Sequence, residues 1–234
     1  AALMGAGLAL GGAWRVARAD WPRFCLVALA AFGSSWFTIQ GFARVAAGLG
    51  AVISMIEPIM IALLAWAVLR ARPRLWLGIA VSLTGAAVLF WPDITARAAD
   101  PVDPLGVVFL IAASASFAAY TIAAKPLLRR YSSFTVTAWP LVIEAVPIIL
   151  LASRPLAELV TETSLRTWAE IIYLAVFNTF VGGILWIHGA RHLLGAVVGS
   201  FLYLMPVIAV VAGHLILDEE GTPALVIGGT SMLA

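Results

Sequence analysis

The chain has 234 residues, of which 63% are hydrophobic and only 11% carry a charge, and its mean hydropathy is +1.04. A soluble domain of this length needs far more charge on its surface, so the composition excludes that class and predicts an integral membrane protein. The net charge of +2 does not predict a nucleic-acid partner, because the basic residues fall in short loops beside apolar segments. The single cysteine, Cys25, has no disulfide partner within the chain.

Apolar segments follow one another along almost the whole chain. A helix crosses the hydrocarbon core of a bilayer in about 20 residues, and seven segments meet that length. Two shorter apolar segments, 1–13 and 222–234, are expected to be truncated helices, and the longest breaks are 92–104 and 153–167. The seven predicted spans are 24–42, 47–69, 74–91, 105–126, 133–152, 168–190 and 195–217.

Basic residues are divided unevenly between alternate loops. Ten of the 14 lysines and arginines fall in one set of loops and four in the other, which also holds most of the acidic residues. Because Lys and Arg are enriched in cytoplasmic loops, the richer set is predicted to face the cytoplasm. The predicted cytoplasmic loops are 15–23, 70–74, 125–130 and 191–194.

The chain contains an internal repeat. The segment 39–69 is echoed by 187–217 at a constant offset of 148 residues, with Pro58 matching Pro206. In the predicted orientation the two copies cross the membrane in opposite directions, so the repeat is inverted. Transporters use such repeats for alternating access, in which a central site opens first to one side of the membrane and then to the other.

The repeat predicts the architecture. We expect an all-α integral membrane protein: a ten-helix bundle built from two five-helix inverted repeats, with the first helix and parts of the end helices missing from this chain. The first half is expected at 1–91, a periplasmic linker at 92–104, and the second half at 105–234.

Three polar side chains are predicted at the middle of the membrane. Placing an ionisable group there costs about 2.5 to 3.5 kcal/mol on insertion scales, so Glu57 and Glu144 need a reason to be there. Asn178 is expected at the same depth, and the three are predicted to share one substrate-binding or coupling cavity. Each glutamate either exchanges a proton or binds a substrate ammonium, or it is protonated and donates a hydrogen bond to a carbonyl freed by a nearby proline.

Other residues are candidates because of their type and spacing. Prolines remove a helical hydrogen bond, so Pro58, Pro147 and Pro206 are candidate hinges, although packing is an equal alternative. Small residues one turn apart allow close helix packing, which is predicted for Ala47, Ala51, Gly195 and Gly199.

Aromatic residues with polar tips are candidates for substrate contact, because a buried polar tip needs a partner. The favoured ones are Tyr120, Trp139 and Tyr203. No metal site is expected, since the three histidines are predicted at the surface or at helix ends.

The segments around both proline helices resemble the EamA-type ten-helix exporters of the drug/metabolite transporter superfamily. The second copy carries Gly189–Ala196, an apolar helix with Pro206 at its middle, and Leu217–Glu220. The first copy repeats that order with Gly41–Arg44 and Glu57–Pro58, but Arg70, Ala71 and Arg72 stand where family members have an acidic residue.

The resemblance implies export of small organic metabolites across a bacterial inner membrane, with amino acids a prominent substrate class. The expected partners are a small-molecule substrate, the lipid bilayer and protons, and no cofactor is expected. A channel-like uniporter or a membrane scaffold stays open as an alternative. An intramembrane enzyme is less favoured, because the sequence has neither His-Glu-x-x-His nor Gly-x-Ser-x-Gly.

Overall fold

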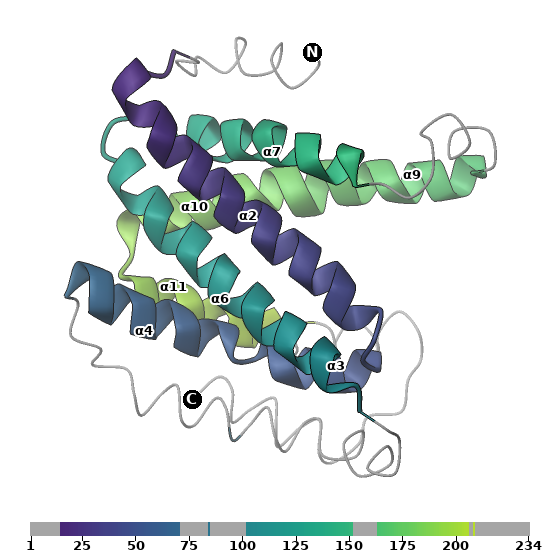
Figure 1. The fold of residues 1–234 in the computed structure, drawn as a ribbon. Helices are drawn as coiled ribbons and strands as arrows, with labels where there is room; N and C mark the ends of the chain where they lie inside the picture. The colour runs from purple at the N-terminus through teal and green to yellow at the C-terminus, as the bar shows by residue number, and fades with distance from the viewer. Residues whose placement is uncertain (1–14, 71–83, 85–101, 152–162, 206–207, 209–234) are drawn as a thin grey trace. The chain divides into compact units, whose positions relative to one another are not determined.

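The computed structural model describes residues 15–70, 84, 102–151, 163–205 and 208 (Figure 1). These residues form helices and turns, and no strand occurs among them. Most of the predicted span 74–91 and the last part of 195–217 lie outside the described residues. The elements in chain order are η1 (Arg18–Asp20), α2 (Trp21–Phe42), α3 (Ala47–Ser54), α4 (Glu57–Leu69), α6 (Pro104–Leu127), α7 (Ser133–Leu150), α9 (Leu165–Tyr173), η2 (Leu174–Val181), α10 (Gly182–His192), α11 (Gly195–Ser200) and η3 (Phe201–Tyr203).

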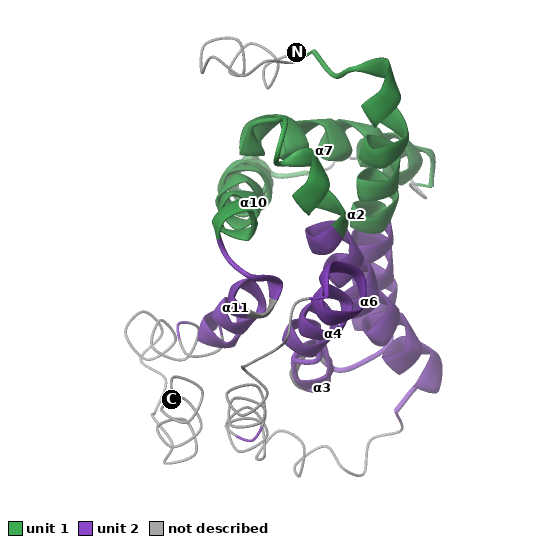
Figure 2. Ribbon diagram, turned by 90° about the vertical axis from the view of Figure 1, so that its left-hand side faces the viewer, with its two compact units in different colours: residues 1–32, 123–192 green, residues 33–122, 193–234 purple. Residues whose placement is uncertain are grey.

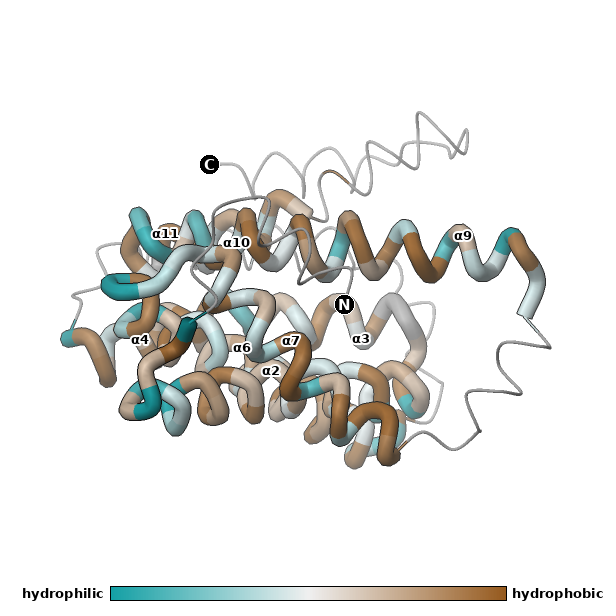
Figure 3. The backbone as a smooth tube through the Cα atoms, turned by 90° about the horizontal axis from the view of Figure 1, so that it is seen from above, coloured by the Kyte–Doolittle hydropathy of each residue, from teal (hydrophilic) through white to brown (hydrophobic). Residues whose placement is uncertain are grey.

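Five helical segments in the described part are long and apolar enough to cross a membrane. Each coincides with a predicted span, and each exposes large apolar side chains, which lipid solvates and water does not. Figure 3 shows the helices mostly in the brown of apolar residues, with several polar residues at helix ends. The secondary structure of the described residues is therefore entirely helical, and the chain is a membrane protein that crosses the bilayer several times. The five segments are Arg18–Phe42, Leu49–Leu69, Pro104–Leu127, Ser133–Leu150 and Leu165–His192.

The chain divides into two compact units (Figure 2). Unit 1 comprises residues 1–32 and 123–192, and unit 2 comprises residues 33–122 and 193–234. Helices α2 and α6 contribute residues to both units.

Unit 1 is built on the packing of α7 against α10. The Phe134 and Phe180 rings meet edge to face with their centroids 5.6 Å apart. Phe24, Val27 and Ile187 are completely buried in the same unit. Burial of these large apolar side chains forms the core of the unit.

Unit 2 depends on close approaches of helix backbones. A Cβ atom at Gly195 would lie 2.8 Å from the Cβ of Ala65, and one at Gly199 would lie 3.3 Å from the Cα and O of Pro58. Small residues in α11 thus let its backbone approach α4 closely. Since Gly195 faces the end of α4 and Gly199 faces its start, the two helices run antiparallel.

The predicted span 47–69 is interrupted in the structure. The helix tightens before α4, where the amide of Ile56 donates to the carbonyl of Ile53, three residues back, at 3.1 Å. The cause is Pro58, which has no N–H to donate to the carbonyl of Ser54, four residues back. The tightened turn therefore lies just before the proline, rather than at it.

The same tightening occurs in the second copy of the repeat. Helix α11 ends at Ser200, and in the following η3 turn the amide of Leu204 donates to the carbonyl of Phe201. This bond lies 148 residues after its counterpart between Ile56 and Ile53, the offset of the sequence repeat. The repeat thus extends from the sequence to a local backbone feature.

The predicted span 168–190 contains an irregular middle. Its residues 174–181 form η2, a π-helix, between α9 and α10. Asn178 lies within it. π-Helical turns are rare and occur frequently at functional sites, and the apolar periodicity of the sequence gave no sign of this one.

Candidate functional site

Glu144 is the one buried residue of α7 beyond Pro140. Its side chain is 8% exposed, and its Oε2 atom has no hydrogen-bond partner in the described structure. The apolar residues on either side of it, Val142 and Val146, are exposed. Helix α7 therefore turns apolar side chains outward and its carboxyl group inward, the arrangement expected of a membrane helix that lines a cavity.

Glu57 is half-buried at the first position of α4, directly after the tightened turn. Tyr203 belongs to η3, which contacts α4. Because α11 and α4 run antiparallel, η3 lies at the end of α4 that begins with Glu57. The Tyr203 side chain is 2% exposed and its hydroxyl has no hydrogen-bond partner in the described structure.

The predicted polar cluster is divided between the two units. Glu57 belongs to unit 2, whereas Glu144 and Asn178 belong to unit 1. Asn178 is exposed within η2. A cavity shared by these three residues stays a prediction.

Two of the aromatic candidates lie beside other aromatic rings. Tyr120 is half-buried, with its ring centroid 6.1 Å from that of Phe117 in the same helix. Trp139 meets Trp21 edge to face at 4.9 Å. Since Trp21 is the first residue of α2, Trp139 lies near the start of that helix.

The candidate hinge and packing residues are placed as follows. Pro147 lies within α7, which continues through it to Leu150. Ala51 is half-buried in α3, and Gly195 and Gly199 lie against α4. Pro206 and the side chain of Ala47 lie outside the described residues.

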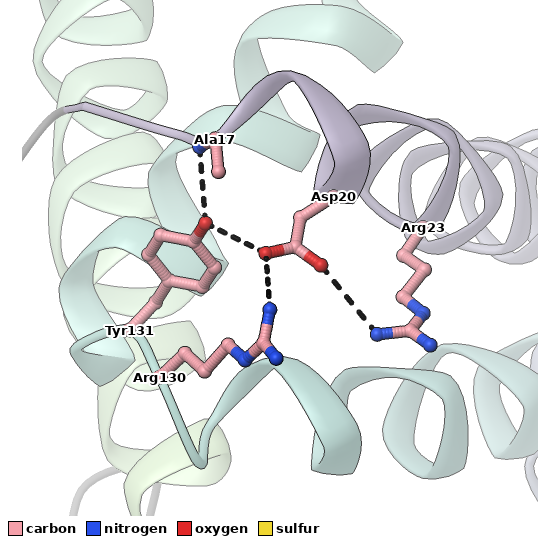
Figure 4. A network of polar contacts seen from close by, with 5 residues as sticks. All are labelled: Ala17, Asp20, Arg23, Arg130 and Tyr131. Atoms are coloured by element: carbon pink, nitrogen blue, oxygen red, sulfur yellow. Dashed lines mark hydrogen bonds and ion pairs between the residues drawn. The ribbon is translucent and has the colours of Figure 1, made fainter.

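A second polar cluster, which the sequence reasoning missed, surrounds Asp20 (Figure 4). The carboxylate is 2% exposed, and it accepts a hydrogen bond from the Tyr131 hydroxyl at 2.9 Å. Arg130 lies 3.3 Å and Arg23 3.5 Å from its oxygens. The Tyr131 hydroxyl also accepts from the backbone amide of Ala17 at 3.1 Å. This Asp20 cluster joins the start of α2 to the turn between α6 and α7.

A signal for this cluster was present in the sequence. Asp20 is the one acidic residue in the four predicted cytoplasmic loops. An isolated acid among many arginines is a natural centre for charge-assisted hydrogen bonds.

Other polar groups do not make a comparable site. His188 and His192 lie one turn apart on α10, with ring centroids 4.7 Å apart. Among the described residues, no group of three His, Cys, Asp or Glu side chains is placed to hold a metal ion. A shallow hollow on α9 is lined by residues of that helix and the start of η2, and Arg166 and Glu170 pair with each other there at 3.1 Å.

Known proteins provide an independent comparison. The chain matches the EamA-like transporter family over residues 1–91 and 104–234. An uncharacterized transporter of Archaeoglobus fulgidus is 25% identical over 94% of this chain and 77% of its own length. A probable terminal-alkyne amino-acid exporter of Streptantibioticus cattleyicolor is 28% identical over 83% of this chain, which spans 64% of that relative. Both relatives are named as transporters rather than enzymes.

A solved crystal structure, described only as that of a protein, shares the fold. It has a TM-score of 0.79 and 19% identity, over 99% of this chain and 79% of its own. With the family match extending over both halves, the chain belongs to the EamA-like transporter family.

Proposed function

We propose that this protein is a secondary transporter that exports small organic metabolites, with amino acids as the favoured class, across the inner membrane. The observation that carries the proposal is the Glu144 carboxyl, which is buried within a membrane helix of a transporter-family protein and has an oxygen without a hydrogen-bond partner in the described structure. An unsatisfied group there is costly unless it binds something during the transport cycle.

Alternating access is the proposed mechanism. The ten-helix architecture with two inverted five-helix halves remains part of the proposal. It is supported by the bond between Ile56 and Ile53 and its counterpart between Leu204 and Phe201, which occur at the repeat offset of 148 residues. Matching tightened turns in the two copies would give each half the same hinge, which suits an exchange between outward-open and inward-open conformations.

Contacts within each unit support the proposed orientation. In unit 1, Tyr131 and Ala17 join two segments that are both predicted at the cytoplasmic side. In unit 2, a Cβ atom at Gly106 would meet Val45 and Arg44, so the start of α6 lies against a turn predicted at the opposite side. Each of these two contacts therefore joins segments that are predicted on the same side of the membrane.

The proposed substrate class follows from charge and from one relative. An amino acid carries an ammonium group, which an ionised Glu57 or Glu144 would bind, and either carboxyl would instead carry a proton in a coupled exchange. The relative in Streptantibioticus cattleyicolor is named a probable amino-acid exporter. Tyr203, whose buried hydroxyl has no partner in the described structure, would supply a further hydrogen bond to the solute.

The test is flux of a panel of radiolabelled amino acids and nucleobases in proteoliposomes, with and without a pH gradient. We expect saturable flux of at least one amino acid, and reduced flux in Glu57→Gln and Glu144→Gln. Protein-free vesicles provide the control. Flux that does not saturate would indicate a channel-like uniporter, and the absence of flux for every solute would favour a scaffold or an enzyme instead.

A further inference from the structure

One face of α7 carries three buried polar side chains, with the apolar Pro140 between the second and the third. Ser133, Thr137, Pro140 and Glu144 follow one another at intervals of four, three and four residues, which places them on one side of a helix with 3.6 residues per turn. All four are buried, and beyond Pro140 only Glu144 is. This α7 polar face continues from the start of the helix to Glu144.

The side chains on this face are incompletely hydrogen-bonded. Ser133 Oγ, in a residue that is 7% exposed, has no partner in the described structure, and neither has Glu144 Oε2. The Thr137 hydroxyl reaches only the carbonyl of Gly183, at 3.4 Å, whereas hydroxyl hydrogen bonds usually measure about 2.5 to 3.0 Å. A Cβ atom at Gly183 would lie 3.1 Å from Thr137 Cγ2, so α10 passes close to the face here.

A buried serine elsewhere shows the contrast. Ser114 in α6 is fully buried, and its hydroxyl donates to the carbonyl of Leu110 in its own helix at 3.0 Å. Ser133 lies at the first position of its helix, where no helical carbonyl stands four residues before it to accept in that way. Unpaired buried polar groups destabilise a fold, and water molecules are the usual partners that remove this cost.

We propose that Ser133, Thr137 and Glu144 line a hydrated route by which water and protons reach Glu144 from the end of α7 that begins at Ser133. Glu144 lies eleven residues after Ser133, a rise of about 16 Å along the helix, which is about half the thickness of the hydrocarbon core. The route rests on the proposed function in one respect: proton exchange between Glu144 and the cytoplasmic side is needed only if Glu144 takes part in transport.

The route is tested by the reactivity of introduced thiols. Cys25 is the only native cysteine, so Cys25→Ser gives a thiol-free background for Ser133→Cys, Thr137→Cys and the matched control Ser114→Cys. In proteoliposomes, a thiolate attacks 2-aminoethyl methanethiosulfonate to form a mixed disulfide, with methanesulfinate as the leaving group; thiolates form in water and are suppressed in apolar surroundings. We expect the Thr137 and Ser133 variants to react at least about tenfold faster than the Ser114 variant.

Equal rates for Thr137→Cys and Ser114→Cys would overturn the route. Labelling of both thiols in denaturant shows that each thiol is intact. A thermal unfolding midpoint near that of Cys25→Ser shows that each variant is folded. The measurement needs no solute flux. Fast labelling without flux would therefore keep the route and reject the export function, whereas flux without labelling would keep the export function and reject the route.

Discussion

Unit 1 contains two buried carboxyl groups, one with hydrogen-bond and ion-pair partners and one with an unpaired oxygen. Asp20, at the start of α2, accepts from Tyr131 and lies within 3.5 Å of two arginines. Glu144, far along α7, has an oxygen with no partner in the described structure and apolar neighbours on both sides. Both residues are buried, Asp20 with 2% and Glu144 with 8% of its surface exposed, so burial by itself does not separate them. The difference lies in how completely their hydrogen bonds are satisfied.

This difference separates a structural role from a functional one. A satisfied carboxylate that joins two segments stabilises the fold, because removing it leaves its partners unpaired. An unsatisfied carboxyl within a membrane helix adds nothing to stability, and its presence there points to a task in which it gains a partner for part of the time. Variants of the two carboxyl groups test this distinction.

The largest expected effect is on transport. Glu144→Gln should lower the initial rate of solute flux at saturating solute by at least about tenfold, which corresponds to about 1.4 kcal/mol in the rate-limiting barrier. Asp20→Asn, compared per folded molecule, should keep a rate near that of the wild type. Equal losses in the two variants would erase the distinction.

The next largest effect is on thermal stability. Here Asp20→Asn should be the more damaging variant, whereas Glu144→Gln is the more damaging one for transport. Asp20→Asn leaves Arg130 and Tyr131 without their carboxylate, so its thermal unfolding midpoint in detergent should fall clearly below that of the wild type. Glu144→Gln should unfold at or above the wild-type temperature. A larger decrease for Glu144→Gln than for Asp20→Asn would contradict the assignment of roles.

A smaller loss is expected for Tyr131→Phe. The change removes a hydroxyl that serves both Asp20 and the amide of Ala17 but keeps the ring, which packs edge to face on Phe24 at 5.4 Å. We expect a loss of about 1 kcal/mol in the free energy of unfolding, measured by denaturant titration, with solute flux per folded molecule unchanged. Stability equal to the wild type would show that the hydroxyl contributes nothing to the cluster.

The smallest effect belongs to Arg23→Gln. Its guanidinium is 59% exposed and lies 3.5 Å from Asp20, a long and solvated contact. The unfolding midpoint should be indistinguishable from that of the wild type at physiological salt. A decrease as large as that of Asp20→Asn would mean that this arginine, and not Tyr131 or Arg130, holds the cluster together.

The sequence predicted the membrane spans well because length and apolar composition determine them. Predicted 24–42 became α2 at Trp21–Phe42, and predicted 105–126 became α6 at Pro104–Leu127. Pro58 was predicted as a candidate hinge, and the structure has a tightened turn just before it, where the carbonyl of Ser54 lacks its helical donor. Its role as a hinge stays a prediction. The π-helix was not predicted, because a single extra residue per turn leaves almost no trace in apolar periodicity.

The candidate site was predicted less completely. Glu144 was identified because it is a single acidic residue within an apolar predicted span, which the sequence alone shows. Ser133 and Thr137 were missed although they share its helical face, because serine and threonine are common in membrane helices and draw attention only through their spacing from Glu144. The Asp20 cluster was missed because it depends on contacts between residues more than 100 positions apart.

The most direct test of the role of Glu144 is accumulation of the transported amino acid against its own gradient, driven by an imposed pH gradient, in vesicles that contain wild type, Asp20→Asn or Glu144→Gln. We expect accumulation by wild type and Asp20→Asn and none by Glu144→Gln, whether the carboxyl carries the proton or binds the ammonium. Accumulation by Glu144→Gln to the wild-type level would contradict it, and would make the buried carboxyl a structural feature of α7.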